Sequence, residues 1–479
     1  MNDSRRGARA AWLLVCAAAL GGCASGPDYR PPALDLPPAF KEAPADAAAW
    51  RPARPRDGEA RGPWWRAYGD TVLDGLVERA LDANVSIAQA EAQLRGARAL
   101  VDTARAGAWP TLGVNAGATR GRSTASRSGG ATVAGGTSTL YTASLAASWE
   151  PDLWGRVRRG VEQAQGNAQA SADDLENARL AVATAVVQDY VALRLADAQQ
   201  ALLGALVDDA ARALQLTRDR VAAGVASDAD VAQAQAQLEG TRAQAIDVQS
   251  QRAASEHALA VLVGEAPARF SITPAADPGA LALALPPVAP GLPAALLERR
   301  PDVAGAERRL AAANAGIGVA QAAWFPSITL GASLGSEAGA LSKLFSAPAA
   351  VWSLGPALAA TLFDGGARRA QTEQARAAYD AALATYRGDV LGAMQEVEDA
   401  LASLRVLADE AVVEQRAVDA AQRSLSLVTS QYRAGTVGYA DVVGARSTAI
   451  TAQRTLLALQ GSRLQASVQL VKALGGAAS

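Results

Sequence analysis

The chain has 479 residues, with 45 Lys and Arg against 47 Asp and Glu, so its formal net charge is −2. This balance excludes the strongly basic surface that nucleic-acid-binding proteins carry. The two cysteines, Cys16 and Cys23, and the single histidine, His257, are too few for a disulfide framework or a Cys/His metal site. We therefore expect no metal and no soluble cofactor, and interpret His257 as a residue on a helix surface.

The N-terminus has the pattern of a secretory signal. Three arginines up to Arg9 precede the apolar run 10–20 and the sequence "LGGC", which ends at Cys23. The apolar run is too short to span a bilayer, so residues 1–22 are predicted to be a cleaved signal peptide. "LGGC" also resembles a lipoprotein signal, which implies a diacylglycerol and an N-acyl chain on Cys23. Ala24 lacks the charge of an inner-membrane retention signal and favours the outer membrane; the alternative is a signal end with an accidental cysteine.

The rest of the chain is a lipidated extended segment followed by a duplication. Residues 23–70 are rich in Pro, Ala, Arg and Asp, which predicts an extended course. Residues 71–264 and 294–476 then repeat one unit, joined by the Pro-rich linker 265–293. Each unit reads as a helix, two strands, a very long helix, a turn and a helix.

The helices follow from long stretches without proline. No proline occurs between Asp152 and Ala266 or after Pro356, so these stretches can be helical throughout. The longest predicted helix is about 100 Å at 1.5 Å per residue, and two shorter helices laid end to end match it. These matching lengths predict that the long helix of each unit packs antiparallel against the two shorter helices. The predicted helices are 71–107, 157–222 and 228–264 in the first unit, and 294–323, 367–432 and 438–474 in the second.

Membrane strands are predicted at about 110–150 and 326–363. Residues 111–119 alternate an apolar and a small polar face, as do residues 327–335. Their partners are 139–149 and 353–363. Four strands cannot close a barrel, and hydrocarbon does not tolerate an open edge, so the protein must oligomerise. The alternative is a small soluble β-sandwich on a coiled coil.

Five stretches together carry a resemblance to a known family over essentially the whole chain. They are "LGGC", "WEPDLWGRVRRGVEQA", "RRPDVAGAERRLAAANAGIGVAQAAWFPSITLGASLG", "TLFDGGARRAQTEQA" and "YRAGTVGYADVVGA". The chain resembles the TolC-like outer-membrane efflux ducts, in their lipoprotein or NodT-type branch. The resemblance implies a mainly α fold with a β-barrel part. Long antiparallel helical hairpins then form an α-barrel, and four strands from each of three protomers form a twelve-stranded outer-membrane barrel.

The same resemblance implies the function and the partners. The expected function is the exit duct of a tripartite efflux pump that carries drugs or other small solutes, without catalysis. The expected partners are two further copies, a periplasmic adaptor, a proton-driven inner-membrane pump and outer-membrane lipid, with no nucleic acid. The alternatives are a duct for protein secretion or metal-ion efflux, and a lipid-tethered coiled coil with no conductance.

The two Ala-Gly turns are the expected hairpin tips and periplasmic gate. Similarity to the family places Asp230, Tyr432 and Asp441 at gate positions, while Val437 and Gly444 depart from the pattern that includes an arginine and a second aspartate. We expect Arg433 to supply the missing cation. The expected adaptor contacts are Gly224, Val225, Gly435 and Thr436. The alternative for both aspartates is that they only cap the helices they begin.

Overall fold

The computed structural model describes residues 25–34, 37, 39–42, 62–122, 126–128, 131–133, 136–275, 283–286 and 299–476. The predicted signal peptide and the predicted lipid site, Cys23, lie outside the described residues. The chain forms two compact units, each made of three stretches. One contains Met1–Ala33, Leu94–Ser171 and Ala306–Tyr386, and the other Leu34–Gln93, Ala172–Gly305 and Arg387–Ser479.

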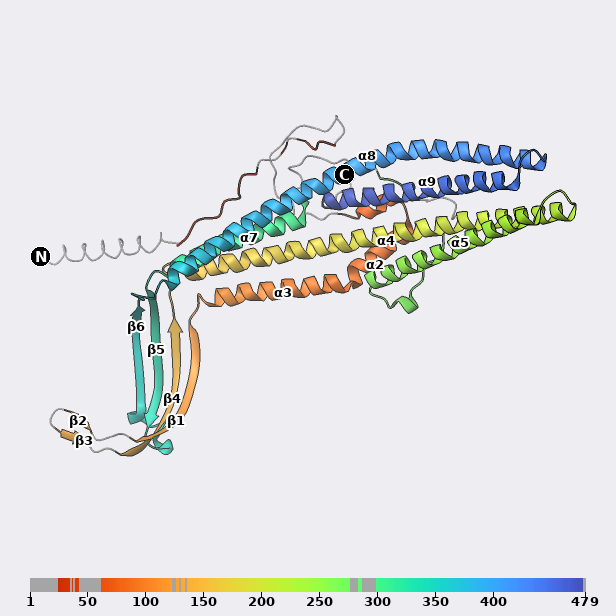
Figure 1. Ribbon diagram of the computed structural model, residues 1–479. Coiled ribbons are helices and arrows are strands. Elements are labelled where there is room, and N and C mark those ends of the chain that lie inside the picture. Colours follow the sequence, from red (N-terminus) through yellow and green to blue (C-terminus); the bar gives the residue numbers. More distant parts are fainter. Residues whose placement is uncertain are drawn as a thin grey trace. The chain divides into compact units, whose positions relative to one another are not determined.

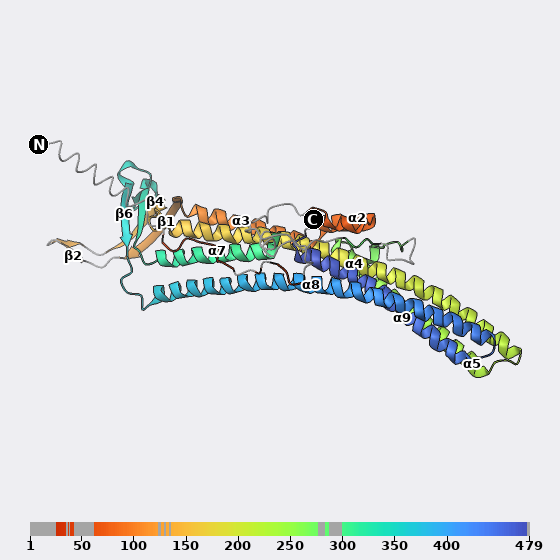
Figure 2. The same ribbon diagram turned by 90° about the horizontal axis from the view of Figure 1, so that it is seen from above.

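Two long helices and two shorter ones form hairpins (Figures 1 and 2). The hairpins are α4 (Arg156–Ala222) with α5 (Asp228–Leu262), and α8 (Ala367–Arg433) with α9 (Tyr439–Ala473). Their ends lie within two residues of the predicted bounds. In α4, Leu203, Ala210, Leu214 and Thr217 recur at heptad spacing and are buried, so this face of the helix is part of the core.

The predicted helix 71–107 is two helices, which corrects the sequence interpretation. α2 (Thr71–Ala83) and α3 (Val85–Ala106) are separated at Asn84, whose backbone is extended. The Asn84 side chain accepts a hydrogen bond from the Ser86 amide at 2.8 Å and donates one to the Leu262 carbonyl at 2.9 Å. Asn84 therefore caps α3 and bonds the end of α5, and this local competition with the helix breaks it.

The second repeat has the same joint. The predicted helix 294–323 is interrupted at Arg300, and α7 (Pro301–Ala322) follows with Pro301 at its first position, where the missing N–H is not needed. Residues 294–298 lie outside the described residues. The residue before it, Arg300, donates to the Ala473 carbonyl at 3.1 Å, as Asn84 donates to Leu262. Gly264 and Gly475, both with positive φ, pack against the backbone of Ala83 and Arg299. The two repeats seen in the sequence therefore also share the same hydrogen bond and the same glycine packing at this joint.

A four-stranded antiparallel sheet has the order β1-β4-β5-β6 (Figure 1). Its strands are β1 (Thr111–Arg122), β4 (Thr137–Trp149), β5 (Ser327–Ala338) and β6 (Ala350–Ala359). β6 ends at Ala359, whereas the sequence predicted residue 363, because β5 begins at Ser327 and offers no partner beyond that pair. The Ser- and Gly-rich stretch 120–138 contains the ends of β1 and β4 and the pair β2 (Ser126–Ser128) and β3 (Ala131–Val133).

The sheet has one continuous apolar face. Val114 pairs with Leu145, Leu145 with Leu334, and Leu334 with Trp352. Val114, Leu334 and Trp352 are 79%, 63% and 76% exposed, although they are large and apolar. Such a face fits lipid. Pro356 lies on the outer strand β6, where a missing backbone donor is tolerated best.

The remaining described elements are short. They are the 3-10 helices η1 (Trp64–Tyr68), η2 (Pro267–Arg269), η3 (Leu341–Lys343) and η4 (Ala347–Ala349). Residues 25–34 form no helix or strand. Within the described residues, no helix is both long and apolar enough to cross a membrane.

Candidate functional site at the hairpin tips

Each hairpin turns through a glycine in the left-handed region. The φ of Gly224 is +72° and that of Gly435 is +76°. The Val225 amide donates to the Arg220 carbonyl at 2.9 Å, and the Thr436 amide to the Gln431 carbonyl at 3.0 Å. These six-to-one bonds close the helix ends as Schellman motifs, which need a residue without a Cβ at the glycine. Val225 and Thr436 are exposed at the turns, as an adaptor contact requires.

The two aspartates expected at the gate each cap the helix at whose start they lie. The Asp230 carboxylate accepts from the Ser227 amide and hydroxyl, both at 2.9 Å, and completes a capping box at the start of α5. The Asp441 carboxylate accepts from the Gly438 amide at 3.1 Å at the start of α9. This geometry is the capping alternative raised by the sequence. Arg433, which was expected to be the gate cation, is exposed.

A different arginine contacts Tyr432. The guanidinium of Arg220 lies 4.3 Å from the centre of the Tyr432 ring, and its Nη1 donates to the Tyr432 carbonyl at 3.1 Å. Arg220 lies in the last turn of α4 and Tyr432 in the last turn of α8, so this contact joins the two hairpins of one chain. Sequence reasoning missed Arg220 because the residue lies 212 positions away, and no local pattern distinguishes it from other helical arginines.

Tyr432 is buried in an apolar cluster of both hairpins. It is 5% exposed, and its ring centre lies 5.4 Å from that of Tyr439. The cluster's buried members are Ala210, Leu214, Ala234, Leu238, Tyr432, Tyr439 and Val442. The Tyr432 hydroxyl and the Arg220 Nε are buried without a hydrogen-bond partner among the described residues. Burial raises the pKa of the Tyr439 hydroxyl, so Tyr439 remains neutral at physiological pH.

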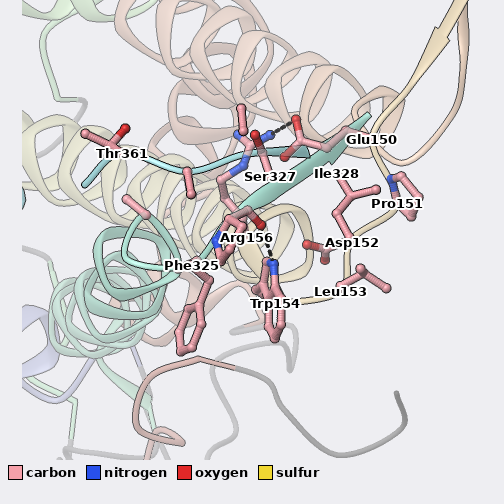
Figure 3. Close-up of a pocket in the computed structure, with 15 residues that line it drawn as sticks. Glu150, Pro151, Asp152, Leu153, Trp154, Arg156, Phe325, Ser327, Ile328 and Thr361 are labelled. Carbon is pink, nitrogen blue, oxygen red and sulfur yellow. Dashed lines mark hydrogen bonds and ion pairs between the residues drawn. The ribbon is translucent and has the colours of Figure 1, made fainter. Parts of the chain in front are cut away.

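A pocket of about 280 Å³ lies where the sheet strands continue into helices (Figure 3). The Trp154 indole N–H donates to the Pro326 carbonyl at 2.6 Å, and the Trp154 and Phe325 rings stack with centres 4.9 Å apart. Arg156 pairs with Glu150 at 3.0 Å. These contacts hold the strand ends together. They do not place a nucleophile beside a base, as covalent catalysis requires.

The N-terminal segment is fixed to the same compact unit. The Ser25 amide donates to the Trp154 carbonyl at 3.1 Å, and buried Arg159 pairs with Asp28 at 2.9 Å. Asn314 donates to the Pro27 carbonyl at 2.8 Å, and the Tyr29 hydroxyl to Glu307 at 3.0 Å. We call residues 25–29 the N-terminal strap. Within the described residues, no cluster of His, Cys, Asp and Glu could hold a metal ion.

Paired long hairpins and a four-stranded sheet with a lipid-compatible face define a protomer of the outer-membrane channel class. The family model described as "Outer membrane efflux protein" matches residues 76–265 and 292–476. The chain belongs to this family.

Relatives match along almost the whole chain. The pyoverdine export outer membrane protein OpmQ of Pseudomonas aeruginosa is 33% identical over 97% of this chain and 96% of its own length. Nodulation protein T of Rhizobium leguminosarum bv. trifolii is 30% identical over 93% of this chain and 91% of its own. The match to nodulation protein T agrees with the NodT-type branch read from the sequence.

Solved structures agree with this assignment. The outer-membrane channel OprN matches with a TM-score of 0.83 and 32% identity, covering 95% of this chain and 99% of that one. CusC, a transmembrane channel, matches with a TM-score of 0.82 and 26% identity, covering 95% of this chain and all of that one. The predicted family and fold class are confirmed.

Proposed function

We propose that three copies of this chain form the exit duct of a tripartite efflux pump. In this proposal the sheets close one outer-membrane barrel, and the hairpins receive solute from a periplasmic adaptor and a proton-driven inner-membrane transporter. The observation that carries the proposal is the sheet, whose apolar face is exposed and whose outer strands β1 and β6 have no strand partner on their outer edges among the described residues. A sheet in lipid must close on itself, and four strands are too few.

The cargo is proposed to be a small solute and the duct itself to be non-catalytic. The printed names of relatives include pyoverdine export, toluene efflux and antibiotic efflux. This range favours a duct that selects little, with the choice made by the pump. Protein secretion and metal-ion efflux through the same fold remain the alternatives.

Mass and conductance together test the duct. The detergent-solubilised protein should have three times the mass of the mature chain plus its lipid, and planar bilayers should show discrete single-channel steps. A folded monomer contradicts the barrel. A folded trimer with no conductance, alone or with the adaptor, supports the structural coiled coil instead.

The gate is proposed to lie at the hairpin tips, with Arg220 as a part of it. We call Arg220, Tyr432 and Tyr439 the tip latch, since they connect the two hairpins of one protomer. A cation over an aromatic ring contributes about 0.5–2 kcal/mol, and a neutral hydrogen bond about 1 kcal/mol. Three symmetric copies of such a contact hold a gate that adaptor docking can outcompete.

The other tip residues keep the roles expected from the family. Asp230 and Asp441 are proposed to lie near the constriction, and Arg433 is a candidate for contacts between copies. The proposed adaptor contacts are Gly224, Val225, Gly435 and Thr436.

A further inference from the structure

We propose that Arg120 and Arg122, which we call the arginine pair, bind the phosphate groups of a glycolipid in the outer leaflet of the membrane. Both lie at the end of β1 that leads away from the helices and toward β2 (Figure 1). The inference rests on the outer-membrane duct proposed above, because that proposal sets this end of the sheet at the outer surface. It adds a ligand that conduction through the duct does not require.

The arginine pair belongs to the apolar face of the sheet. Side chains alternate between the two faces along a strand, so Arg120 and Arg122 share the face of Val114. They are the only charged residues of this face within β1, β4, β5 and β6. The one acidic residue of these four strands, Glu337, belongs to the opposite face. The face that fits lipid is therefore apolar along most of its length and purely cationic at one end.

Two aromatic residues on β4 mark the height of the apolar band. Tyr141 and Trp149 lie on this face eight residues apart, with small or apolar residues between them. Eight residues span about 27 Å along a strand, or about 21 Å across the membrane at a tilt of about 40°, which is close to the apolar band of about 25 Å of known barrels. Arg120 pairs with Thr139, two residues beyond Tyr141. The arginine pair thus begins where the apolar band ends, at the height of the lipid headgroups.

The second repeat shows that the fold does not need these charges. β1 and β5 are equivalent strands of 12 residues each. Arg120 and Ser336 are the tenth residues of their strands, and Arg122 and Ala338 are the twelfth. β5 keeps its register with β4 through the uncharged residues. Both arginines are exposed, and neither side chain has an ion-pair partner among the described residues, so the pair is free to bind an anion.

Phosphate on a glycolipid is the chemistry that matches this position. A guanidinium stays charged and donates two parallel N–H bonds to phosphate oxygens, while its apolar stem lies along the lipid face. Alternate residues of a strand are about 7 Å apart, so the arginine pair can hold two phosphate groups at once. The outer leaflet of a bacterial outer membrane consists largely of a glycolipid with several phosphate groups. A zwitterionic phospholipid offers a single phosphate beside an amine and fits the pair less well.

Lipid binding to the detergent-solubilised trimer tests the arginine pair. Native mass spectrometry measures dissociation constants for bisphosphorylated lipid A, dephosphorylated lipid A and phosphatidylglycerol. The test variant, Arg120→Ser with Arg122→Ala, introduces the residues of the second repeat, which β5 already accommodates. Arg120→Lys with Arg122→Lys keeps the charge without the guanidinium. The matched control, Arg416→Gln with Arg423→Gln, removes two exposed arginines of α8 that lie at least about 70 Å along the helix from its start.

We expect the test variant to bind lipid A at least tenfold more weakly than the parent, because one cation beside an anionic lipid surface contributes about fivefold in affinity. The lysine variant should lie between the two, and the α8 control should bind like the parent. Dephosphorylated lipid A tests the same contact on the unchanged protein and should also bind at least tenfold more weakly.

Parental affinity of the test variant for lipid A, or undiminished binding of the dephosphorylated lipid, overturns the proposal. Equally tight binding of phosphatidylglycerol overturns the assignment to a glycolipid. A monomeric mass of the parent protein, measured before any lipid is added, overturns the proposed function and this inference with it, so the two failures are distinguishable.

Discussion

The Arg220 guanidinium contacts both the backbone carbonyl and the aromatic ring of one residue, Tyr432. One nitrogen donates to the Tyr432 carbonyl while the cation lies over the Tyr432 ring. The Tyr432 hydroxyl, by contrast, is buried without a partner among the described residues. The latch therefore depends on the aromatic ring and the cation rather than on the phenol group.

This arrangement predicts that Arg220→Gln favours the open duct. If each latch contributes about 1.4 kcal/mol, its loss changes the open-to-closed ratio roughly tenfold per protomer. Single-channel recording in planar bilayers measures this as longer and larger openings. Tyr432→Phe keeps the ring and should behave like the parent, whereas Tyr432→Ala should resemble Arg220→Gln.

Three further variants separate the latch from the other gate candidates. Asp230→Ala and Asp441→Ala remove helix caps, at a cost of about 1 kcal/mol each, and Arg433→Gln removes an exposed cation. If the two aspartates only cap their helices, the Asp230→Ala and Asp441→Ala channels should have the same conductance as the parent channel. An Arg220→Gln channel with parental conductance, beside an open Asp441→Ala channel, would contradict the latch and restore the gate inferred from the family.

At the scale of elements, the duplicated joints organise the chain. Asn84 in the first repeat and Arg300 in the second bond the end of a returning helix. Arg300 also pairs with Asp302 and Glu396, both at 2.6 Å, although only 7% of it is exposed. Burial by itself would raise the pKa of Asp302, but the hydrogen bonds and the charge of Arg300 outweigh it and lower that pKa below its usual value.

Arg300→Ala should destabilise the protein, because it leaves a buried carbonyl and two carboxylates without their cation. The expected cost is about 3 kcal/mol, seen as a lower melting temperature of the solubilised protein. Arg369→Ala, at an exposed position of α8, is the matched control and should melt like the parent.

The same joint predicts a pH dependence. Since the folded pKa of Asp302 is lowered, its ionised form stabilises the fold at neutral pH, and this contribution is lost as the pH falls through the lowered value. Asp302→Asn should therefore melt below the parent at pH 7, and the difference should shrink below about pH 4. A difference that is constant with pH would mean that Asp302 acts through packing alone.

The sequence predicted elements well where a pattern repeats and poorly where a single contact decides. Periodicity and the absence of proline predicted α4 and α8 to within about one residue, because long helices average over many positions. The break at Asn84 was missed because it depends on a carbonyl 178 positions away. Arg220 was missed for the same reason, while the Ala-Gly turns were found because positive φ demands glycine locally.

At the scale of the whole molecule, the duct has two independent ways to stay in the membrane. One is the exposed apolar face of the sheet, which the proposed barrel continues around three copies. The other is the predicted acyl anchor on Cys23. The strap fixes Ser25, the first described residue, to the Trp154 carbonyl.

We predict that Cys23→Ser abolishes labelling by radioactive palmitate while the protein remains a conducting trimer. The sheet alone spans the membrane in this proposal, so loss of the acyl chains should affect anchoring and assembly efficiency more than conductance. Cys16→Ala, which changes the other cysteine within the predicted signal peptide, is the matched control and should keep full labelling. Mass spectrometry of the mature N-terminus gives a second readout, with Cys23 as the first residue. Persistent labelling of Cys23→Ser would place the lipid on another residue, and an unmodified first residue other than Cys23 would contradict acylation of Cys23.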